Sequence, residues 1–327
     1  MQTPRHARTL ASGPPRRTNG AARVFGSAAV VTSIALLAAC GNGDRTADRA
    51  TSRPSRSSSG SPRSVSPSAT PTPSESVTDA PTASATPITS PAPRTSGVYF
   101  VADTRSGLRL TRELRDLPGA DPVKEAVQAM ISGPQDPDYR STWNPRTQVR
   151  SVDPAGNVVT VDLSPAARKV SVGSEAAERM VQQLVYTVTE AARRPQAKVR
   201  LTIGGQPAGD LWGAVSWTDP IGRADPAAVR MLVQISTPRE GAATGSPVRV
   251  AGEADAFEAN VPWQVVDGHG NVVKQGAATA LEGMQFSPYS FTVKLPPGTY
   301  TVRVAEDDPS AGEGGAPMAD TKRITVG

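Results

Sequence analysis

The chain has 327 residues, long enough for two ordinary domains, and a formal net charge of +5. Of its 35 basic residues, five arginines precede Cys40 and no acid does, which leaves 30 basic against 30 acidic residues from Cys40 onward. The chain after the leader is therefore close to neutral, which argues against a nucleic-acid-binding surface. Cys40 is the only cysteine, so an internal disulfide is excluded.

Residues 1–39 have the pattern of a signal peptide. Basic and polar residues precede an uncharged apolar run of about 14–16 residues, which is shorter than the roughly 20 that a membrane-spanning helix needs. The run ends in Leu37, Ala38 and Ala39, directly before Cys40. An uncleaved helical anchor with an unused cysteine is the alternative. An arginine pair in the leader lacks the hydrophobic pair that follows it in twin-arginine signals, so both export routes stay open.

Leu37, Ala38, Ala39 and Cys40 together resemble the bacterial lipobox. The resemblance implies that the Cys40 thiol receives a diacylglyceryl group and that the chain is cut before it. Membrane lipid would then be a partner through Cys40, and each buried CH₂ would contribute about 0.8 kcal/mol to the attachment. We expect a lipoprotein of the plasma membrane, anchored by lipid on the extracytoplasmic face.

Residues 40–96 read as a disordered linker. They are rich in Ser, Thr, Pro and Ala and contain almost no large apolar side chain, so no core offsets the entropy of ordering them. A flexible coil of this length spans roughly 40 Å root mean square, from about 5–6 Å times the square root of the residue number. The expected role is reach, which lifts the folded part off the membrane.

Residues 97–219 combine helix and strand patterns. A helix is predicted from Asp121-Pro122, a good N-cap and first-turn pair, to Gly133. A second helix is predicted from 175, with Ser174 as N-cap, and ends before Pro195. Both helices have one apolar face, and they alternate with short strands. This pattern predicts a two-layer α/β sandwich, with the helices on one face of a small sheet. The predicted strands are 98–101, 148–152, 158–163 and 199–203.

Six segments of this region carry a resemblance: 98–101, 129–134, 144–145, 158–164, 182–185 and 199–203. In this order they resemble the sporulation and spore germination domain called GerMN. The resemblance implies a non-catalytic module of envelope proteins, used in assembly or ligand binding, and it supplies no catalytic residues. Asp162 and Ser164 stand at a strand end, where a cap or turn role is expected rather than a site.

Residues 227–327 show only strand patterns. Apolar residues alternate from Val229 to Ile235, and turn residues recur about every 8–12 positions, which is typical of a β-sandwich. Segments 238–263, 291–293 and 325–326 resemble the immunoglobulin-like domain of bacterial spore germination proteins. The predicted fold class is therefore α+β, with a GerMN-like domain followed by an immunoglobulin-like sandwich. Proline, glycine and aspartate residues between 219 and 226 break regular secondary structure, and they predict a boundary between two separate domains there.

Two motifs in the second region invite a functional interpretation. The segment 267–271 offers oxygen and nitrogen donors, but its composition is that of a hairpin turn. Phe257, Glu258, Asn260 and Trp263 suggest a binding edge, against the alternative of core residues beside a solvent-facing acid.

The sequence predicts no catalytic, cofactor-binding or metal-binding residues. His269 is the only histidine after the leader, and the single cysteine is expected to be acylated. This removes Cys–His catalysis and His-rich zinc sites. The chain also lacks the G-x-S-x-G, H-E-x-x-H and S-x-x-K motifs.

We therefore expect a non-enzymatic envelope lipoprotein that acts as a binding or scaffold module. Its expected partner is an envelope protein or a cell-wall glycan, and no nucleic acid. A regulatory accessory of a sensor kinase or of cell-wall machinery is the alternative. A wall-modifying enzyme is a third possibility, because sequence does not show which carboxylates converge.

Overall fold

The computed structural model describes residues 94–307, 313 and 315–327, all of which belong to one compact unit, Thr82–Gly327. The predicted signal peptide, the lipobox residues 37–39 with Cys40, and nearly all of the predicted linker lie outside the described residues. In the part of the chain that is described, no helix is both long and apolar enough to cross a bilayer.

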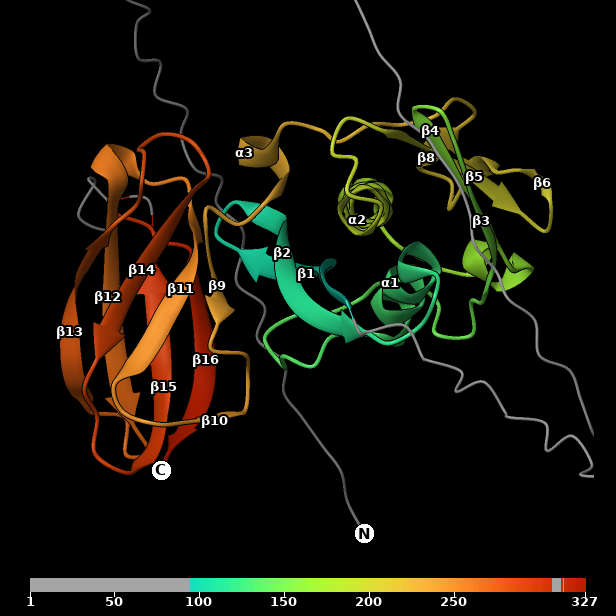
Figure 1. Cartoon of the computed structure of the whole chain (residues 1–327). Helices are drawn as coiled ribbons and strands as arrows, with labels where there is room; N and C mark the ends of the chain where they lie inside the picture. The colour runs from blue at the N-terminus through green and yellow to red at the C-terminus, as the bar shows by residue number, and fades with distance from the viewer. Residues whose placement is uncertain (1–93, 308–312, 314) are drawn as a thin grey trace, which may run out of the picture. The chain divides into compact units, whose positions relative to one another are not determined.

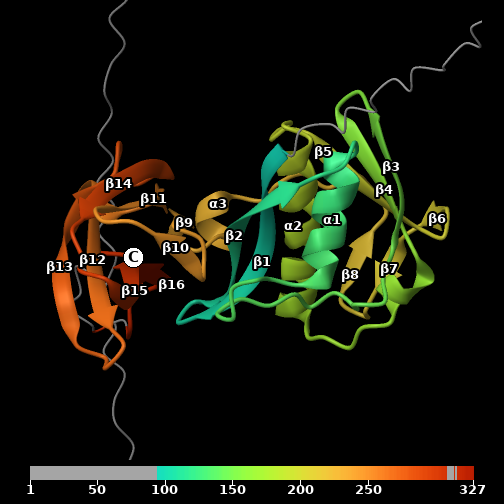
Figure 2. The same cartoon turned by 60° about the horizontal axis from the view of Figure 1, so that its bottom comes forward.

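The first half of the described chain contains two long helices, a hairpin and a small sheet. Strands β1 and β2 form the antiparallel hairpin, and β3 to β6 form a separate sheet in which β4 and β5 run parallel. Figures 1 and 2 show α1 and α2 between the hairpin and this sheet. The elements are β1 (Arg94–Thr104), β2 (Gly107–Leu117), α1 (Pro122–Ser132), β3 (Val149–Ala155), β4 (Val158–Leu163), α2 (Ser174–Ala191), β5 (Lys198–Ile203), β6 (Gln206–Pro207), β7 (Gly209–Leu211) and β8 (Val215–Trp217).

The hairpin adds a layer to the predicted arrangement. The two helices cover one face of the β3–β6 sheet, as expected, and the β1–β2 hairpin packs against their other side. The prediction placed the first strand without its partner, because β2 mixes leucines with charged residues along its whole length. The fold class α+β is confirmed.

Local chemistry explains where the helices begin. The Asp121 carboxylate accepts a hydrogen bond from the Lys124 backbone N–H at 3.0 Å, so α1 starts at the predicted cap. The predicted N-cap of α2 is wrong by one residue. Gly173 occupies that position, and Ser174 is already helical.

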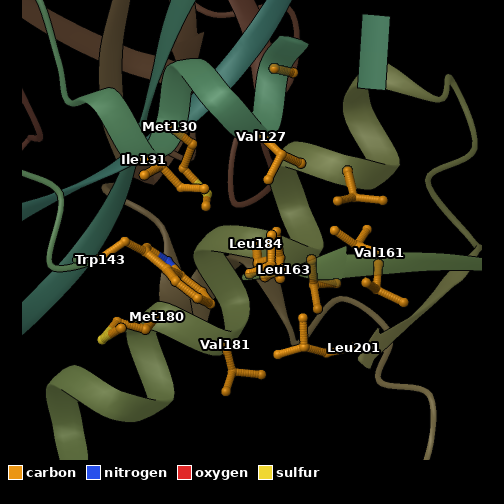
Figure 3. Packing of buried hydrophobic residues seen from close by; sticks show 14 of the residues in the cluster. Val127, Met130, Ile131, Trp143, Val161, Leu163, Met180, Val181, Leu184 and Leu201 are labelled. Atoms are coloured by element: carbon orange, nitrogen blue, oxygen red, sulfur yellow. The ribbon is translucent and has the colours of Figure 1, made fainter. Parts of the chain in front are cut away.

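The core of this half lies where the helices meet the sheet (Figure 3). Met130 and Ile131 of α1, Leu184 of α2 and Val161 of β4 are at most 2% exposed. Burying each such side chain contributes roughly 1.5–3 kcal/mol. The apolar side chains that alternate along the strands therefore pack, in one core, against the apolar side chains that recur at helical spacing in α1 and α2.

The second half is a β-sandwich, as predicted. One sheet has the strand order β10-β16-β15-β12-β13 and the other β14-β11-β9. Its apolar core is separate from that of the first half. The elements are α3 (Pro226–Val229), β9 (Val233–Thr237), β10 (Ala242–Thr244), β11 (Val248–Ala254), β12 (Asn260–Asp267), β13 (Val272–Thr279), β14 (Ser287–Val293), β15 (Gly298–Ala305) and β16 (Ala319–Val326).

The strand predicted from Val229 begins later, at Val233. Asp225 and Pro226 impose a short helical turn instead, because the Asp225 carboxylate caps it through the Ala227 N–H at 3.0 Å. Val229 closes that turn rather than opening a strand.

Candidate binding groove

The strand-end pair named in the sequence has structural roles. The Asp162 carboxylate accepts hydrogen bonds from Thr202 Oγ1 at 2.9 Å and from the Gly205 N–H at 2.8 Å. Ser164 Oγ makes no cap bond but accepts one from the Gln148 N–H at 3.0 Å. These side chains tie neighbouring loops together and do not form a site.

The turn at 267–271 is also structural. The Asp267 carboxylate accepts hydrogen bonds from the backbone N–H groups of Asn271 and His269, both at 2.9 Å, and these bonds lower its pKa, the one from Asn271 most. In the other motif, Trp263 stacks on Phe291 with a 4.5 Å ring separation, as core residues do. Among the described residues, no group of three or more His, Cys, Asp or Glu side chains is placed to hold a metal ion.

A groove of about 610 Å³ opens in the first half of the described chain. Five elements form it: the start of β1, strand β2 at Leu114, the start of α1, the end of α2 and the edge strand β3. Its size lies within the range of ligand pockets, about 300–1,000 Å³. Its apolar lining includes Leu114, Val123, Val152, Pro122, Pro154, Ala191 and Ala192.

One of the two acidic side chains that line the groove, Glu190, is neutralised by neighbouring arginines. The Glu190 carboxylate lies 3.2 Å from Arg112 Nη1 and 3.2 Å from Arg223 Nη2. Gly97 makes this possible, since a Cβ there would lie 2.8 Å from Cγ of Arg112 and 3.0 Å from Oε1 of Glu190. The hydroxyl of Tyr99 also reaches Glu190 at 3.5 Å, and burial raises the pKa of Tyr99 to about 12.

Three exposed arginines on the rim therefore dominate the charge of the groove. Arg94 and Arg193 make no hydrogen bond or ion pair through their side chains with any described residue, and Arg194 donates one to the Gly156 carbonyl at 3.0 Å. Asp121, the acid on the rim, is occupied in capping α1. The rim thus presents cationic side chains to anything that enters.

Arg193 is held in a conformation that glycine usually takes. Its φ is +55°, and the N–H groups of Arg193 and Arg194 donate to the carbonyls of Glu190 and Thr189, both at 2.9 Å. This is the Schellman pattern that closes a helix, with arginine where glycine is preferred. Basic residues also suit a helix C-terminus, so the charge has a structural reason as well.

Two open strand edges border the groove. Within the described part of the chain, β1 pairs only with β2 along residues 94–97, and β3 pairs only with β4. Backbone N–H and C=O groups on an open edge accept an added extended strand. The groove therefore combines main-chain edges, apolar walls and cationic rim side chains, which together suit an extended acidic and apolar segment.

A second cluster of polar side chains joins the two halves, and its members bind one another. Lys322 Nζ of β16 lies 2.8 Å from Asp136 and 2.7 Å from Asp320, and it donates to the Tyr139 hydroxyl at 2.5 Å. Burial alone would lower the pKa of Lys322, but the two carboxylates outweigh it and raise the pKa. Asp320 also accepts from the Ile235 N–H at 2.5 Å. We call these side chains the junction cluster, and they satisfy one another rather than a ligand.

The sequence prediction missed the groove. Its lining comes from short stretches far apart in the chain, and no spacing motif connects them. The one local signal was the Arg193-Arg194 pair after an apolar helix. The predicted lipidation residues Leu37, Ala38, Ala39 and Cys40 lie outside the described residues.

Two families match parts of the chain. The family described as sporulation and spore germination matches residues 97–209. The family described as the immunoglobulin-like domain of bacterial spore germination matches residues 232–313. No curated protein sequence matches the chain.

Solved structures with similar parts have low identity to the chain. The tandem GerMN domains of the sporulation protein GerM from Bacillus subtilis match with 18% identity and a TM-score of 0.35, over 44% of this chain and 50% of that one, so the chain spans half of that structure's length. The first GerMN domain of the same protein matches with 20% identity and a TM-score of 0.33, over 41% of this chain and 100% of that one. A putative lipoprotein from Clostridium perfringens matches with 18% identity and a TM-score of 0.29, over 40% of this chain and 88% of that one.

Proposed function

We propose that this chain, which carries a sporulation and spore germination domain followed by an immunoglobulin-like domain of bacterial spore germination, is a membrane-anchored envelope lipoprotein that works by binding. The groove of the first domain is its binding site, and an extended protein segment with acidic and apolar side chains is its ligand. No reaction is assigned to it, and neither family description names one.

The observation that carries the proposal is the combination of an apolar groove with a cationic rim. Arg94 and Arg193 are exposed without side-chain partners among the described residues, while the Glu190 carboxylate that also lines the groove is already paired. Charged groups around an apolar site provide orientation and selectivity, and the apolar walls provide the area that is buried.

Anchoring through Cys40 is the second part of the proposal, and its support is the lipobox-like sequence. A tethered binder gains effective concentration when its linker reaches the target. Labelling cells with a fatty-acid probe tests it: the wild-type chain is expected to take up label and the Cys40→Ala chain none. Equal label on both chains contradicts the anchor.

The groove is tested by the binding of synthetic extended peptides to the purified chain. A peptide that alternates Glu with apolar residues is expected to bind, and the same peptide with Lys in place of Glu is not. Arg94→Ala and Arg193→Ala should each weaken binding about two- to five-fold, because exposed ion pairs contribute roughly 0.2–1 kcal/mol.

Arg146→Ala is the matched control, since Arg146 is exposed and lies outside the groove. It should leave the affinity unchanged. Equal losses for Arg146→Ala and Arg193→Ala would show that the peptide responds only to net charge, and the groove would not be the site.

A further inference from the structure

One end of the β-sandwich exposes large apolar side chains. Phe257, Leu281 and Met284 expose 47%, 74% and 76% of their surface. They belong to the connection from β11 to β12 and the connection from β13 to β14, and the pairing of Asn260 with Thr279 brings these connections to the same end of the sheet. We call these three residues the apolar tip.

The tip is rigid. The Met284 N–H donates to the Ala256 carbonyl at 2.9 Å, and the Ala280 N–H donates to the Ala259 carbonyl at 2.8 Å. Gly283 lets the two backbones touch, because a Cβ there would lie 2.8 Å from the Ala259 nitrogen. The two loops therefore hold each other, and the apolar side chains stay exposed instead of folding back onto the sandwich.

Acidic side chains accompany the tip. Glu258 and Glu282 follow Phe257 and Leu281 directly, and both are exposed. Arg230 lies over the Phe286 ring at 4.1 Å, but it is 7% exposed and bound to Glu253. An anionic lipid surface does not suit such a tip, and two tips facing each other would bring like charges together.

The complementary chemistry is present on the same molecule. The groove offers apolar walls and the arginines 94, 193 and 194 on its rim, while the tip offers an apolar centre with glutamates beside it. We propose that the tip of one copy of this chain occupies the groove of a second copy. This inference rests on the proposed function, because it takes over the apolar walls and the cationic rim of the groove. It names a folded occupant, two loops held together, in place of an extended segment, and the strand edges play no part in it.

Such a contact is heterologous: each copy contributes its tip to one neighbour and its groove to another. Heterologous contacts produce rings when the rotation closes and open chains when it does not. Self-association of the full chain is therefore expected, as a closed ring whose smallest case is the reciprocal dimer, or as an open chain.

Disulfide crosslinking between two co-expressed, differently tagged copies of the full chain tests the contact. One copy carries Met284→Cys in the tip and the other carries Ala192→Cys in the groove. A crosslinked mixed pair is expected, while either variant alone should give no more crosslink than the parent chain, whose Cys40 sets the background. Lys274→Cys on the exposed strand β13 replaces the tip cysteine in the control and should not crosslink to Ala192→Cys.

Charge reversal decides whether the pairing is specific. Glu258→Arg with Glu282→Arg on the tip copy should lower the crosslink yield about tenfold, as should Arg193→Glu with Arg194→Glu on the groove copy. Both changes together should restore it, which also shows that the variants fold.

The inference is overturned if the crosslink yield stays the same after either charge reversal. It is also overturned if crosslinks form between two tip cysteines. Failure of the tip–groove crosslink in a chain whose groove binds the acidic peptide overturns the second copy as occupant and leaves the groove's function standing. Failure of both removes both proposals.

Discussion

Arg193 combines a conformational cost with a place on the rim of the groove. Its positive φ closes helix α2 in the place where glycine is favoured, and its side chain lies on the groove rim without a partner among the described residues. A non-glycine residue in this conformation costs about 1–2 kcal/mol. Strain of this kind is often found at functional sites, and here it accompanies one of the three arginines that give the groove its charge.

Arg193→Gly should therefore stabilise the fold while it weakens peptide binding. The relief of strain exceeds the entropy that glycine adds to the unfolded chain, about 0.5–1 kcal/mol, so a net gain of about 0.5–1 kcal/mol is expected. Urea denaturation measures it. Arg194→Gly is the control, because Arg194 does not have a positive φ and its bond to the Gly156 carbonyl would be lost. A loss of stability in both variants would contradict the argument.

Single residues also show which roles can be predicted from sequence and which cannot. Asp121 was recognised because a cap and the helix that it starts are adjacent in sequence. Glu190 was not recognised, because its neutralisation by Arg112 and Arg223 depends on contacts between residues more than 30 positions apart. A site built from such contacts leaves no local pattern to read.

Among the elements, strand β11 depends on a glycine at a bulge. The pairing of β11 with β9 shifts register between Ala251 and Gly252. A Cβ on Gly252 would overlap the Gln234 carbonyl oxygen and would lie 2.7 Å from the Tyr289 hydroxyl. The two strands approach so closely there that only a hydrogen fits.

Gly252→Ala should destabilise the sandwich by about 1–3 kcal/mol, the usual cost of overpacking a core. The thermal midpoint of the full chain measures the effect. Gly268→Ala is the matched control in the same domain, since no atom of the described residues lies within 4 Å of a Cβ there and its φ is not positive. Equal midpoints for the two variants would show that the strands can separate without cost.

The elements that were predicted from sequence are those with a strong period. Helix α1 and strands β4 and β5 have one buried face that the apolar spacing reveals. Strand β2 was missed because its position against α2 and β9 lets charged side chains line both of its faces. Val229 was assigned to a strand because its spacing from Val233 fits alternation, while the cap at Asp225 decided the local structure.

At the scale of the whole molecule, charged groups connect the two halves. Glu253 of β11 lies 3.3 Å from Arg112 of β2 and 2.7 Å from Arg230. Arg239 contacts Asp116 of β2 through two hydrogen bonds, at 2.7 and 2.9 Å, which together with Thr95 lower the pKa of Asp116. The prediction that each half folds alone remains a prediction, and these contacts are what each half would lose.

The connection is expected to weaken in acid. Burial alone would raise the pKa of Glu253, but Arg112 and Arg230 outweigh it and hold the pKa below its ordinary 4.5. A carboxylate with a lowered pKa contributes stability that is complete above 4.5 and is lost as the pH falls through its folded value.

The free energy of unfolding, measured by denaturant at pH 7 and again below pH 4.5, should therefore fall less in Glu253→Gln than in the wild type. Asp136 acts in the opposite direction, since burial raises its pKa, but it is present in both chains and cancels in the comparison. An equal loss of unfolding free energy in the two chains would show that the ionisation of Glu253 does not make the stability depend on pH.

The junction cluster shields the Lys322 amine, so the reactivity of that amine reports on the contact between the two halves. Lys322 is 4% exposed, and its amine is held by Asp136, Asp320 and Tyr139 together. An amine-reactive reagent cannot reach it while these contacts are closed, and a protonated amine in an ion pair is a poor nucleophile. Acylation of Lys322 is therefore expected only while the two halves are transiently apart. Its rate, relative to that of the exposed Lys274, measures how often the halves separate.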